Sequence, residues 1–231
     1  MKKILITIII FSTILYAKDY REYYENGQLK VSGKLKDGVG EGTWFSYYEN
    51  GQIQNEMNYK NGEGNGLWRG YYETGEIKVE VYCKDDKFYG DMVGYYKNGQ
   101  PSERTKYKEG LSNGKSTLYF KDGNIKSQGY YKDGVKYGRW VDYFDSGQPW
   151  VEVQYIDTTG YVRIINSWDK NGNITLEDGS GIYIDYYDNG VKYSQGTFLY
   201  GKPNGEWLYF GEEQEIIKKE FYEDGELVEK H

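Results

Sequence analysis

Two short segments contain residue types in an order that could bind a phosphate group or a cation. Residues 110–116, GLSNGKS, resemble a phosphate-binding loop, but three residues separate the glycines where that loop has four. Residues 169–173, DKNGN, resemble the start of a calcium loop, but Ile174 and Ser180 stand where such a loop has glycine and a bidentate glutamate. We interpret both segments as hairpin turns of an internal repeat, and we expect neither a metal ion nor a cofactor.

The inventory for acid–base and nucleophilic chemistry is small. His231, the only histidine, is the last residue, so a serine or cysteine nucleophile has no imidazole partner and zinc lacks its usual ligands. Cys83 is the only cysteine, and we expect a packed or free thiol there. Paired carboxylates remain available among 36 acidic residues, but most of these flank turns, as on a solvated face. We therefore predict no catalytic residues and no enzymatic activity.

The composition is poor in aliphatic residues and rich in tyrosine. After Ala17, Leu, Ile, Val and Phe are sparse, but the chain has 28 tyrosines and 6 tryptophans. Aromatic rings bury large areas, so they can supply the apolar surface that the aliphatic residues do not. The net charge is −7 and no local run of Lys and Arg interrupts the acidic background, which argues against nucleic acid as a partner.

Residues 1–17 have the layout of a secretory signal peptide. Met1-Lys2-Lys3 is followed by an apolar run from Ile4 to Tyr16 that ends at Ala17. The run is shorter than the roughly 20 residues of a membrane span. We expect cleavage before Lys18, export to the periplasm, cell surface or medium, and no transmembrane span afterwards. An uncleaved anchor is the alternative.

Glycine and aromatic residues recur at every 24th position. One glycine of the period stands at 27, 51, 75, 99, 123 and 147, and a second at 42, 66, 90, 114 and 138. An aromatic pair lies between them, at 47–48, 71–72, 95–96, 119–120 and 143–144. Such regular internal similarity is the signature of a repeat architecture.

Each unit has the features of a β-hairpin. Turn signals such as Asn50-Gly51 and Asp133-Gly134 occur about every 12 residues, and Ile77, Val79 and Val81 alternate with polar or tyrosine residues. Because 24 is even, every copy presents the same residues to the same face of a sheet. The sequence thus predicts an all-β fold, an elongated antiparallel β-hairpin solenoid. We expect regular repeats over 18–147, a divergent repeat over 148–185, and further repeats with a C-terminal cap over 186–231.

The repeated unit G-x-W-x-x-Y-Y-x-N-G-x-[IL]-K resembles the bacterial MORN-variant repeat. It is followed by segments such as Tyr59-Lys60-Asn61-Gly62 and Tyr131-Lys132-Asp133-Gly134, which fit the same pattern. Proteins with this repeat are often labelled YwqK-type antitoxins. The resemblance implies a hairpin solenoid that acts as a scaffold or binding surface, without catalytic residues.

Two aromatic ladders are the candidate binding features. One contains Trp44, Trp68 and Trp140, and the other contains Tyr47, Tyr71, Tyr95, Tyr119 and Tyr143. One ladder can form the core while the other stabilises the strands across the sheet. Alternatively, the tyrosine ladder is exposed and binds a partner. We expect a protein partner, with a glycan as the alternative: a carbohydrate- or choline-type cell-wall array. A toxin-neutralising antitoxin is the second alternative.

Overall fold

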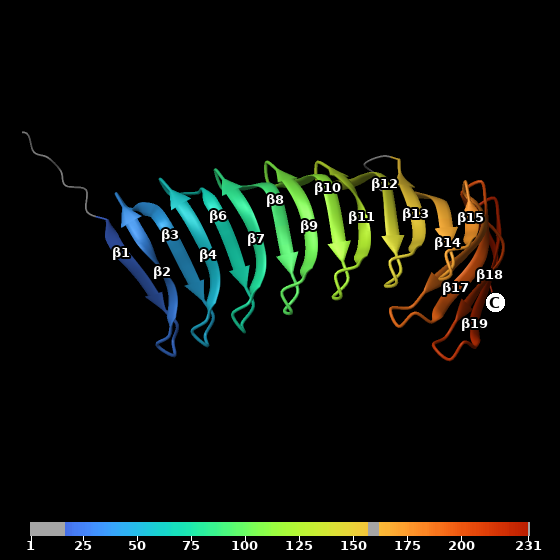
Figure 1. Ribbon diagram of the computed structural model, residues 1–231, viewed down its shortest axis with the longest axis horizontal. Helices are drawn as coiled ribbons and strands as arrows, with labels where there is room; N and C mark the ends of the chain where they lie inside the picture. The colour runs from blue at the N-terminus through green and yellow to red at the C-terminus, as the bar shows by residue number, and fades with distance from the viewer. Residues whose placement is uncertain (1–16, 157–161, 231) are drawn as a thin grey trace, which may run out of the picture.

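The computed structural model describes residues 17–156 and 162–230 as one long, open, antiparallel sheet (Figure 1). The sheet has 20 strands, and the described residues include no helix, as the sequence predicted. The described residues therefore contain no helix that is long and apolar enough to cross a membrane. The predicted signal peptide lies almost wholly outside the described residues, as does His231.

The strands follow one another along the sheet in chain order, and β4 pairs with both β5 and β6 because Asn65 interrupts the next strand. Their bounds are β1 Lys18–Tyr23, β2 Leu29–Lys36, β3 Val39–Tyr47, β4 Ile53–Lys60, β5 Glu63–Gly64, β6 Gly66–Tyr71, β7 Ile77–Lys84, β8 Lys87–Tyr95, β9 Pro101–Lys108, β10 Leu111–Tyr119, β11 Ile125–Lys132, β12 Val135–Tyr143, β13 Pro149–Tyr155, β14 Val162–Trp168, β15 Ile174–Glu177, β16 Ser180–Tyr186, β17 Lys192–Leu199, β18 Lys202–Phe210, β19 Ile216–Glu223 and β20 Glu226–Lys230.

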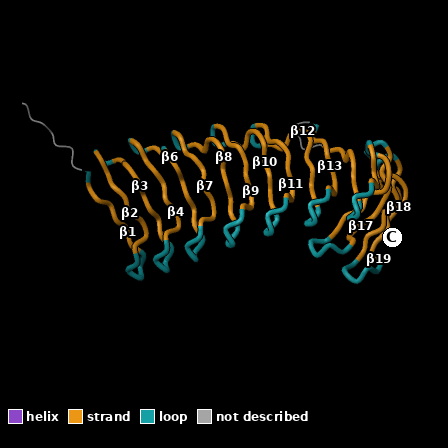
Figure 2. The backbone as a smooth tube through the Cα atoms, in the orientation of Figure 1, coloured by secondary structure: helices purple, strands orange, loops and turns teal. Residues whose placement is uncertain are grey.

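Two kinds of turn alternate along the two edges of the sheet (Figure 2). At one edge, two-residue turns such as Asp133-Gly134 have both residues at positive φ, as type I′ turns require. At the other edge, three-residue turns close with hydrogen bonds such as Gly51 N–H to Tyr48 O (2.9 Å). In the Asn50-Gly51 turn only the glycine has positive φ, and Asn50 instead accepts a hydrogen bond from the Gln52 N–H. Asn50-Gly51 is therefore not a two-residue tight turn, although it does form a hairpin.

Three tryptophans lie flat over a glycine of the preceding strand. The pairs are Gly33 with Trp44, Gly129 with Trp140, and Gly196 with Trp207, and a Cβ atom on any of these glycines would collide with the indole ring. The indole fits only because the glycine has no side chain. At each site, the register shift opposite the glycine gives the tryptophan strand extra residues, as in a bulge.

Successive hairpins are joined by a hydrogen bond between side chain and backbone. The second residue of an aromatic pair donates its hydroxyl to the backbone carbonyl of the residue 23 positions later. These bonds are Tyr24 to Tyr47 (2.6 Å), Tyr48 to Tyr71 (2.8 Å), Tyr72 to Tyr95 (2.7 Å), Tyr96 to Tyr119 (2.6 Å) and Tyr187 to Phe210 (2.8 Å). We call them the tyrosine latches. At Phe120 and Phe144 the position has no hydroxyl, so the latch is lost there.

The regular row of hairpins ends where β15 is only four residues long. Beyond it, strands β16 to β19 turn away from the row (Figure 1). The short β15 brings β13 and β16 close enough for Trp150 Nε1 to donate to the Ile184 carbonyl at 3.0 Å. This region also holds a buried apolar cluster of Leu176, Phe198 and Trp207. The predicted divergent repeat includes residues 157–161, which lie outside the described residues.

Candidate interaction surface

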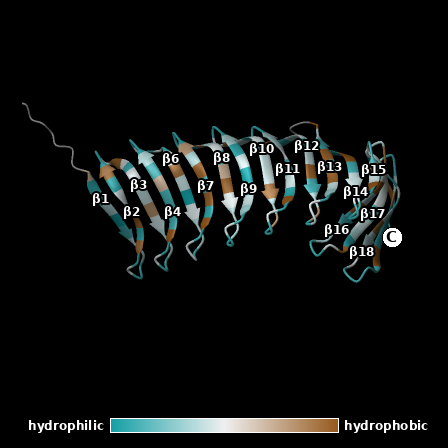
Figure 3. Cartoon of the chain, in the orientation of Figure 1, coloured by the Kyte–Doolittle hydropathy of each residue, from teal (hydrophilic) through white to brown (hydrophobic). Residues whose placement is uncertain are grey.

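Each strand presents alternate residues to two faces of the sheet, and the two faces differ in character. The tryptophan face carries Trp44 paired with Met57, and Trp68 paired with Val81. The tyrosine face is the opposite one, where the cross-strand row runs through Phe45, Glu56, Arg69, Glu80, Val93, Arg104, Thr117, Gln128, Val141 and Glu152. Figure 3 shows that strands mix hydrophilic and hydrophobic residues instead of forming a continuous apolar layer.

The five tyrosines predicted to bind a partner lie on the tyrosine face, and all are half-buried. Four of them use their hydroxyls in hydrogen bonds to the residue 15 positions earlier. These contacts are Tyr47 with Ser32 (3.1 Å), Tyr71 with Glu56 (3.1 Å), Tyr95 with Glu80 (3.0 Å) and Tyr143 with Gln128 (2.5 Å). These four hydroxyls contribute to holding neighbouring strands together, and the five half-buried side chains keep part of their surface exposed.

An ion-pair network supports this ladder on three neighbouring strands. Arg69 lies between Glu80, at 2.7 Å, and Glu56, at 3.5 Å. The hydrogen bond from Arg69 lowers the pKa of the Glu80 carboxyl. Burial, and then the nearby carboxylates, raises the pKa of both Tyr71 and Tyr95. The two tyrosines are therefore held in the neutral, hydrogen-bond-donating form.

Four other tyrosines on this face are far more exposed, and sequence reasoning missed them. Tyr82 and Tyr89 pair directly across two strands with exposures of 59% and 52%, and Tyr130 and Tyr137 do so with 55% and 48%. The second pair stands two repeats after the first in the chain. This interval of two repeats could have indicated the two pairs from the sequence. At another repeat, however, the same positions hold Lys34 and Glu41, so the tyrosines do not recur at every repeat.

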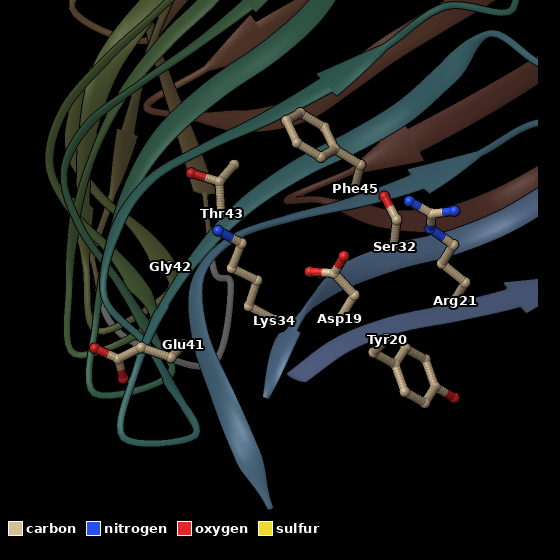
Figure 4. Close-up of a pocket in the computed structure, with 10 residues that line it drawn as sticks. Asp19, Tyr20, Arg21, Ser32, Lys34, Glu41, Gly42, Thr43 and Phe45 are labelled. Atoms are coloured by element: carbon tan, nitrogen blue, oxygen red, sulfur yellow. The ribbon is translucent and has the colours of Figure 1, made fainter. Parts of the chain in front are cut away.

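Shallow grooves lie beside two of the Gly–Trp bulges. The first has a volume of about 440 Å³ and includes Asp19, Arg21 and Lys34 in its lining. Figure 4 shows Asp19, Arg21, Ser32 and Phe45 on one side of the strands and Tyr20 on the other. The second, of about 370 Å³, is lined by the residues found four repeats later, which are Lys115, Gln128, Gly129, Tyr130, Arg139 and Val141. The repeat thus copies a groove along the sheet, with different side chains in each copy.

A third groove, of about 390 Å³, lies where the row of hairpins ends. Phe144, Trp150 and Tyr186 form its aromatic wall, with ring centroids 5.6–6.2 Å apart. The Lys170 ammonium lies 4.9 Å from the centre of the Tyr186 ring and donates to the Gly190 carbonyl at 2.6 Å. This groove combines ring faces with polar groups, which suits a ligand that has both apolar and hydroxyl-bearing surfaces.

The segments that resembled ligand-binding loops form turns and strands. Residues 109–110 make a two-residue turn, and residues 111–116 belong to β10, so no helix follows the turn as a phosphate loop requires. Asp169 accepts hydrogen bonds from the N–H groups of Asn171 and Asn173 and from the Asn173 side chain. These bonds lower the pKa of Asp169.

Cys83 is a free, half-buried thiol whose pKa is raised by burial. Within the part of the chain that the structure describes, no group of three or more His, Cys, Asp and Glu side chains has the geometry to hold a metal ion.

Five segments match the MORN repeat variant family: residues 18–37, 40–61, 65–85, 112–133 and 136–157. The intervening strands β8 and β9 form the same kind of hairpin, although this segment is not among the matches. No curated protein matches the chain.

Several solved structures of toxin complexes show a distant similarity. A chain of the Photorhabdus luminescens Tc holotoxin pore is 12% identical with a TM-score of 0.22, over 89% of this chain and 12% of the toxin chain. A chain of the TcdB2-TccC3 structure is 13% identical with a TM-score of 0.23, over 90% of this chain and 13% of that one. This chain therefore spans about an eighth of the length of these relatives, and such low TM-scores do not indicate a shared overall fold.

Proposed function

The chain carries MORN-variant repeats, and from that premise we propose that it is a non-enzymatic scaffold that binds another protein through its tyrosine face. The observation that carries this proposal is the uncovered sheet face with four tyrosines about half exposed. Tyrosine is enriched at protein interfaces because it offers a large apolar ring together with a polar group. Tyr47, Tyr71, Tyr95, Tyr119 and Tyr143 line the same face and would extend the contact.

Site-specific photo-crosslinking tests this function. A photoreactive benzoyl-phenylalanine replaces Tyr82 or Tyr130 in the full chain produced in its own cells, and cross-linked proteins are identified by mass spectrometry. Tyr131 is the matched control, because it is the next residue after Tyr130 but lies against Trp140 on the tryptophan face. One recurring protein should be captured from both tyrosine-face positions and not from Tyr131. Capture of no protein, or the same set from all three positions, would contradict the proposal.

Export is part of this proposal, because residues 1–17 fit a signal peptide. Sequencing the mature N-terminus after cell fractionation should give Lys18 and an exported product. A chain that retains residues 1–17 in the cytosol would argue against export. It would favour the toxin-neutralising role, which otherwise rests on the family resemblance alone.

Glycan binding is a second candidate, favoured by the aromatic wall of the third groove. Sugar rings stack on aromatic side chains, and Phe144, Trp150 and Tyr186 line this groove together. Binding to purified wall polysaccharides should be lost in Trp150→Ala and retained in Trp150→Tyr, which keeps an aromatic ring. Equal binding by both variants, or none by the parent chain, would exclude this groove.

A further inference from the structure

Five lysines form an evenly spaced row along the edge of the sheet that carries the two-residue turns. Each is the last residue of its strand and is exposed, and the next residue has positive φ. The row consists of Lys36, Lys60, Lys84, Lys108 and Lys132. The sequence shows no local cluster because these residues are 24 positions apart, but the fold brings them into line. We call this set the lysine row.

The row has a regular spacing, and its described lysines form no close ion pairs. Neighbouring members lie two strands apart, which corresponds to about 9.4–9.8 Å. Among the described residues, no carboxylate forms an ion pair with any lysine of the row, whereas the nearby Lys87 pairs with Glu109 at 3.0 Å. The row therefore offers a series of lysine ammonium groups outside close ion pairs, on a protein whose net charge is −7.

The two exposed tyrosine pairs lie beside the row on the same face. Tyr82 precedes Lys84 by two residues in β7, and Tyr130 precedes Lys132 by two residues in β11, so each tyrosine and its lysine point the same way. The Lys132 ammonium lies 5.5 Å from the centre of the Tyr137 ring. A partner that contacts the lysines at these strands would therefore also contact the tyrosine rings.

The spacing distinguishes among possible partner conformations. A polyproline II segment has three residues per turn and rises about 3.1 Å per residue, so every third side chain lies on one side, about 9.3 Å apart. That interval matches the lysine row. In a β-strand, side chains three residues apart point to opposite faces, so the same sequence could not bind all the lysines. Proline rings in such segments pack on aromatic side chains, as the tyrosine pairs would allow.

The charges next to the row favour separated carboxylates over a continuous polyanion. The residue after each lysine is acidic at four of the five positions: Asp37, Asp85, Glu109 and Asp133, with Asn61 at the fifth. These acids would repel the closely spaced phosphates of a nucleic acid. A protein segment with one acidic residue per turn has widely spaced carboxylates, so each one can contact a lysine of the row and avoid the neighbouring acidic residues.

We propose that the lysine row and the two tyrosine pairs bind an acidic polyproline II segment of a partner protein, with a carboxylate at every third residue. This inference rests on the proposed scaffold function and names the chemistry of the partner.

Fluorescence anisotropy with the full chain tests it directly. The probe is a labelled peptide of five Glu-Pro-Pro triplets, compared with peptides of Gln-Pro-Pro and Glu-Gly-Gly triplets. The Glu-Pro-Pro peptide should bind best, because Gln removes the charge and glycine removes the preformed helix. Equal binding of the Gln-Pro-Pro or Glu-Gly-Gly peptide would overturn the proposal. Tighter binding of an oligothymidylate or of polygalacturonate would also overturn it, in favour of an anionic polymer.

Charge-reversal variants locate the site. The variant K84E/K108E/K132E should weaken Glu-Pro-Pro binding by at least about tenfold. The control K78E/K97E/K121E makes the same change of net charge on exposed residues near the opposite edge of the sheet, and it should stay within about twofold of the parent. Equal losses in both variants would show that only net charge matters and would contradict the proposed site.

A third variant, Tyr82→Ala with Tyr130→Ala, should also weaken binding of the peptide. Circular dichroism spectra of all variants should match that of the parent chain. If the photo-crosslinks appear but the Glu-Pro-Pro peptide does not bind, this inference fails while the scaffold function stands. If no protein is cross-linked, the scaffold function fails.

Discussion

The regular hairpins from β1 to β12 and the C-terminal strands from β13 to β20 are built from similar units but are stabilised differently. In the regular part, the strands contact their neighbours along the row, and the tyrosine latches connect one repeat to the next. The C-terminal part keeps one latch, from Tyr187 to Phe210, and there Leu176, Phe198 and Trp207 also form a buried cluster. The same unit thus forms an extended ladder in one region and adds a compact apolar cluster in the other.

This difference predicts where the molecule tolerates change. A ladder of nearest-neighbour contacts distributes its stability over many small interactions. A core concentrates stability in a few large side chains whose removal leaves a cavity. Equivalent substitutions at the half-buried Trp44 and the buried Trp207 should therefore have unequal effects, which equilibrium unfolding in urea can measure.

The largest effect is expected for truncation of the core tryptophan. Trp207→Ala should destabilise the C-terminal strands by about 3–5 kcal/mol, because Trp207 is buried against Phe198 and Tyr183. Trp44→Ala should cost clearly less, since Trp44 is only half-buried near the end of the row. The two urea midpoints give the comparison, and equal losses would show that burial of the ring does not set its contribution to stability.

The second-largest loss of stability is expected when a glycine beneath a tryptophan is replaced. Gly196→Ala should destabilise the protein by about 1–3 kcal/mol, because the new methyl group collides with the enclosed Trp207 ring. Gly33→Ala creates the same collision with Trp44, but that ring has fewer neighbours and can move away at lower cost. Thermal melting of both variants should show the larger drop for Gly196→Ala. A larger drop for Gly33→Ala would contradict this view of the two regions.

The third effect concerns pH. Hydrogen bonds from Lys218, Tyr209 and Tyr222 lower the pKa of Glu220 from 4.5 to about 2. Because the folded pKa is the lower one, this carboxylate stabilises the fold above pH 4.5, and the stabilisation is lost as the pH falls towards 2. Glu220→Gln should be less stable than the parent at pH 7 and should flatten the pH dependence of the urea midpoint between those limits. An unchanged pH profile would show that Glu220 is not coupled to folding.

The smallest effect is expected for a single tyrosine latch. Tyr72→Phe removes the hydroxyl that binds the Tyr95 carbonyl and should cost about 1 kcal/mol. The reverse change, Phe120→Tyr, supplies a hydroxyl where the latch is missing and should stabilise the neighbouring repeats by a similar or smaller amount. Hydrogen exchange of the adjacent strands provides the measurement. Unchanged exchange in both variants would show that the latches do not couple repeats.

Much of the fold could be predicted because the even spacing of the repeats determines which side chains share a face. The spacing predicted the hairpins, the absence of helices and the separation of Trp44 from Tyr47 onto opposite faces, as the described residues show. The lysine row and the exposed tyrosine pairs were missed for a physical reason. Residues such as Tyr82 and Tyr130 are far apart in sequence. Their exposure depends on the three-dimensional surroundings of the strand ends, which the sequence pattern does not describe. Contacts such as Trp150 with Ile184 depend on the short β15, whose effect on the sheet no local pattern encodes.

The serial order of the strands has a mechanical consequence. The first and last strands lie towards opposite ends of the molecule (Figure 1). A pulling force applied at those ends would act on the ladder hydrogen bonds of the outermost hairpin before reaching the next. Bonds loaded in sequence rupture at lower force than bonds loaded together in shear. Under tension, the chain would lengthen stepwise, one hairpin at a time, and behave as an extensible tether.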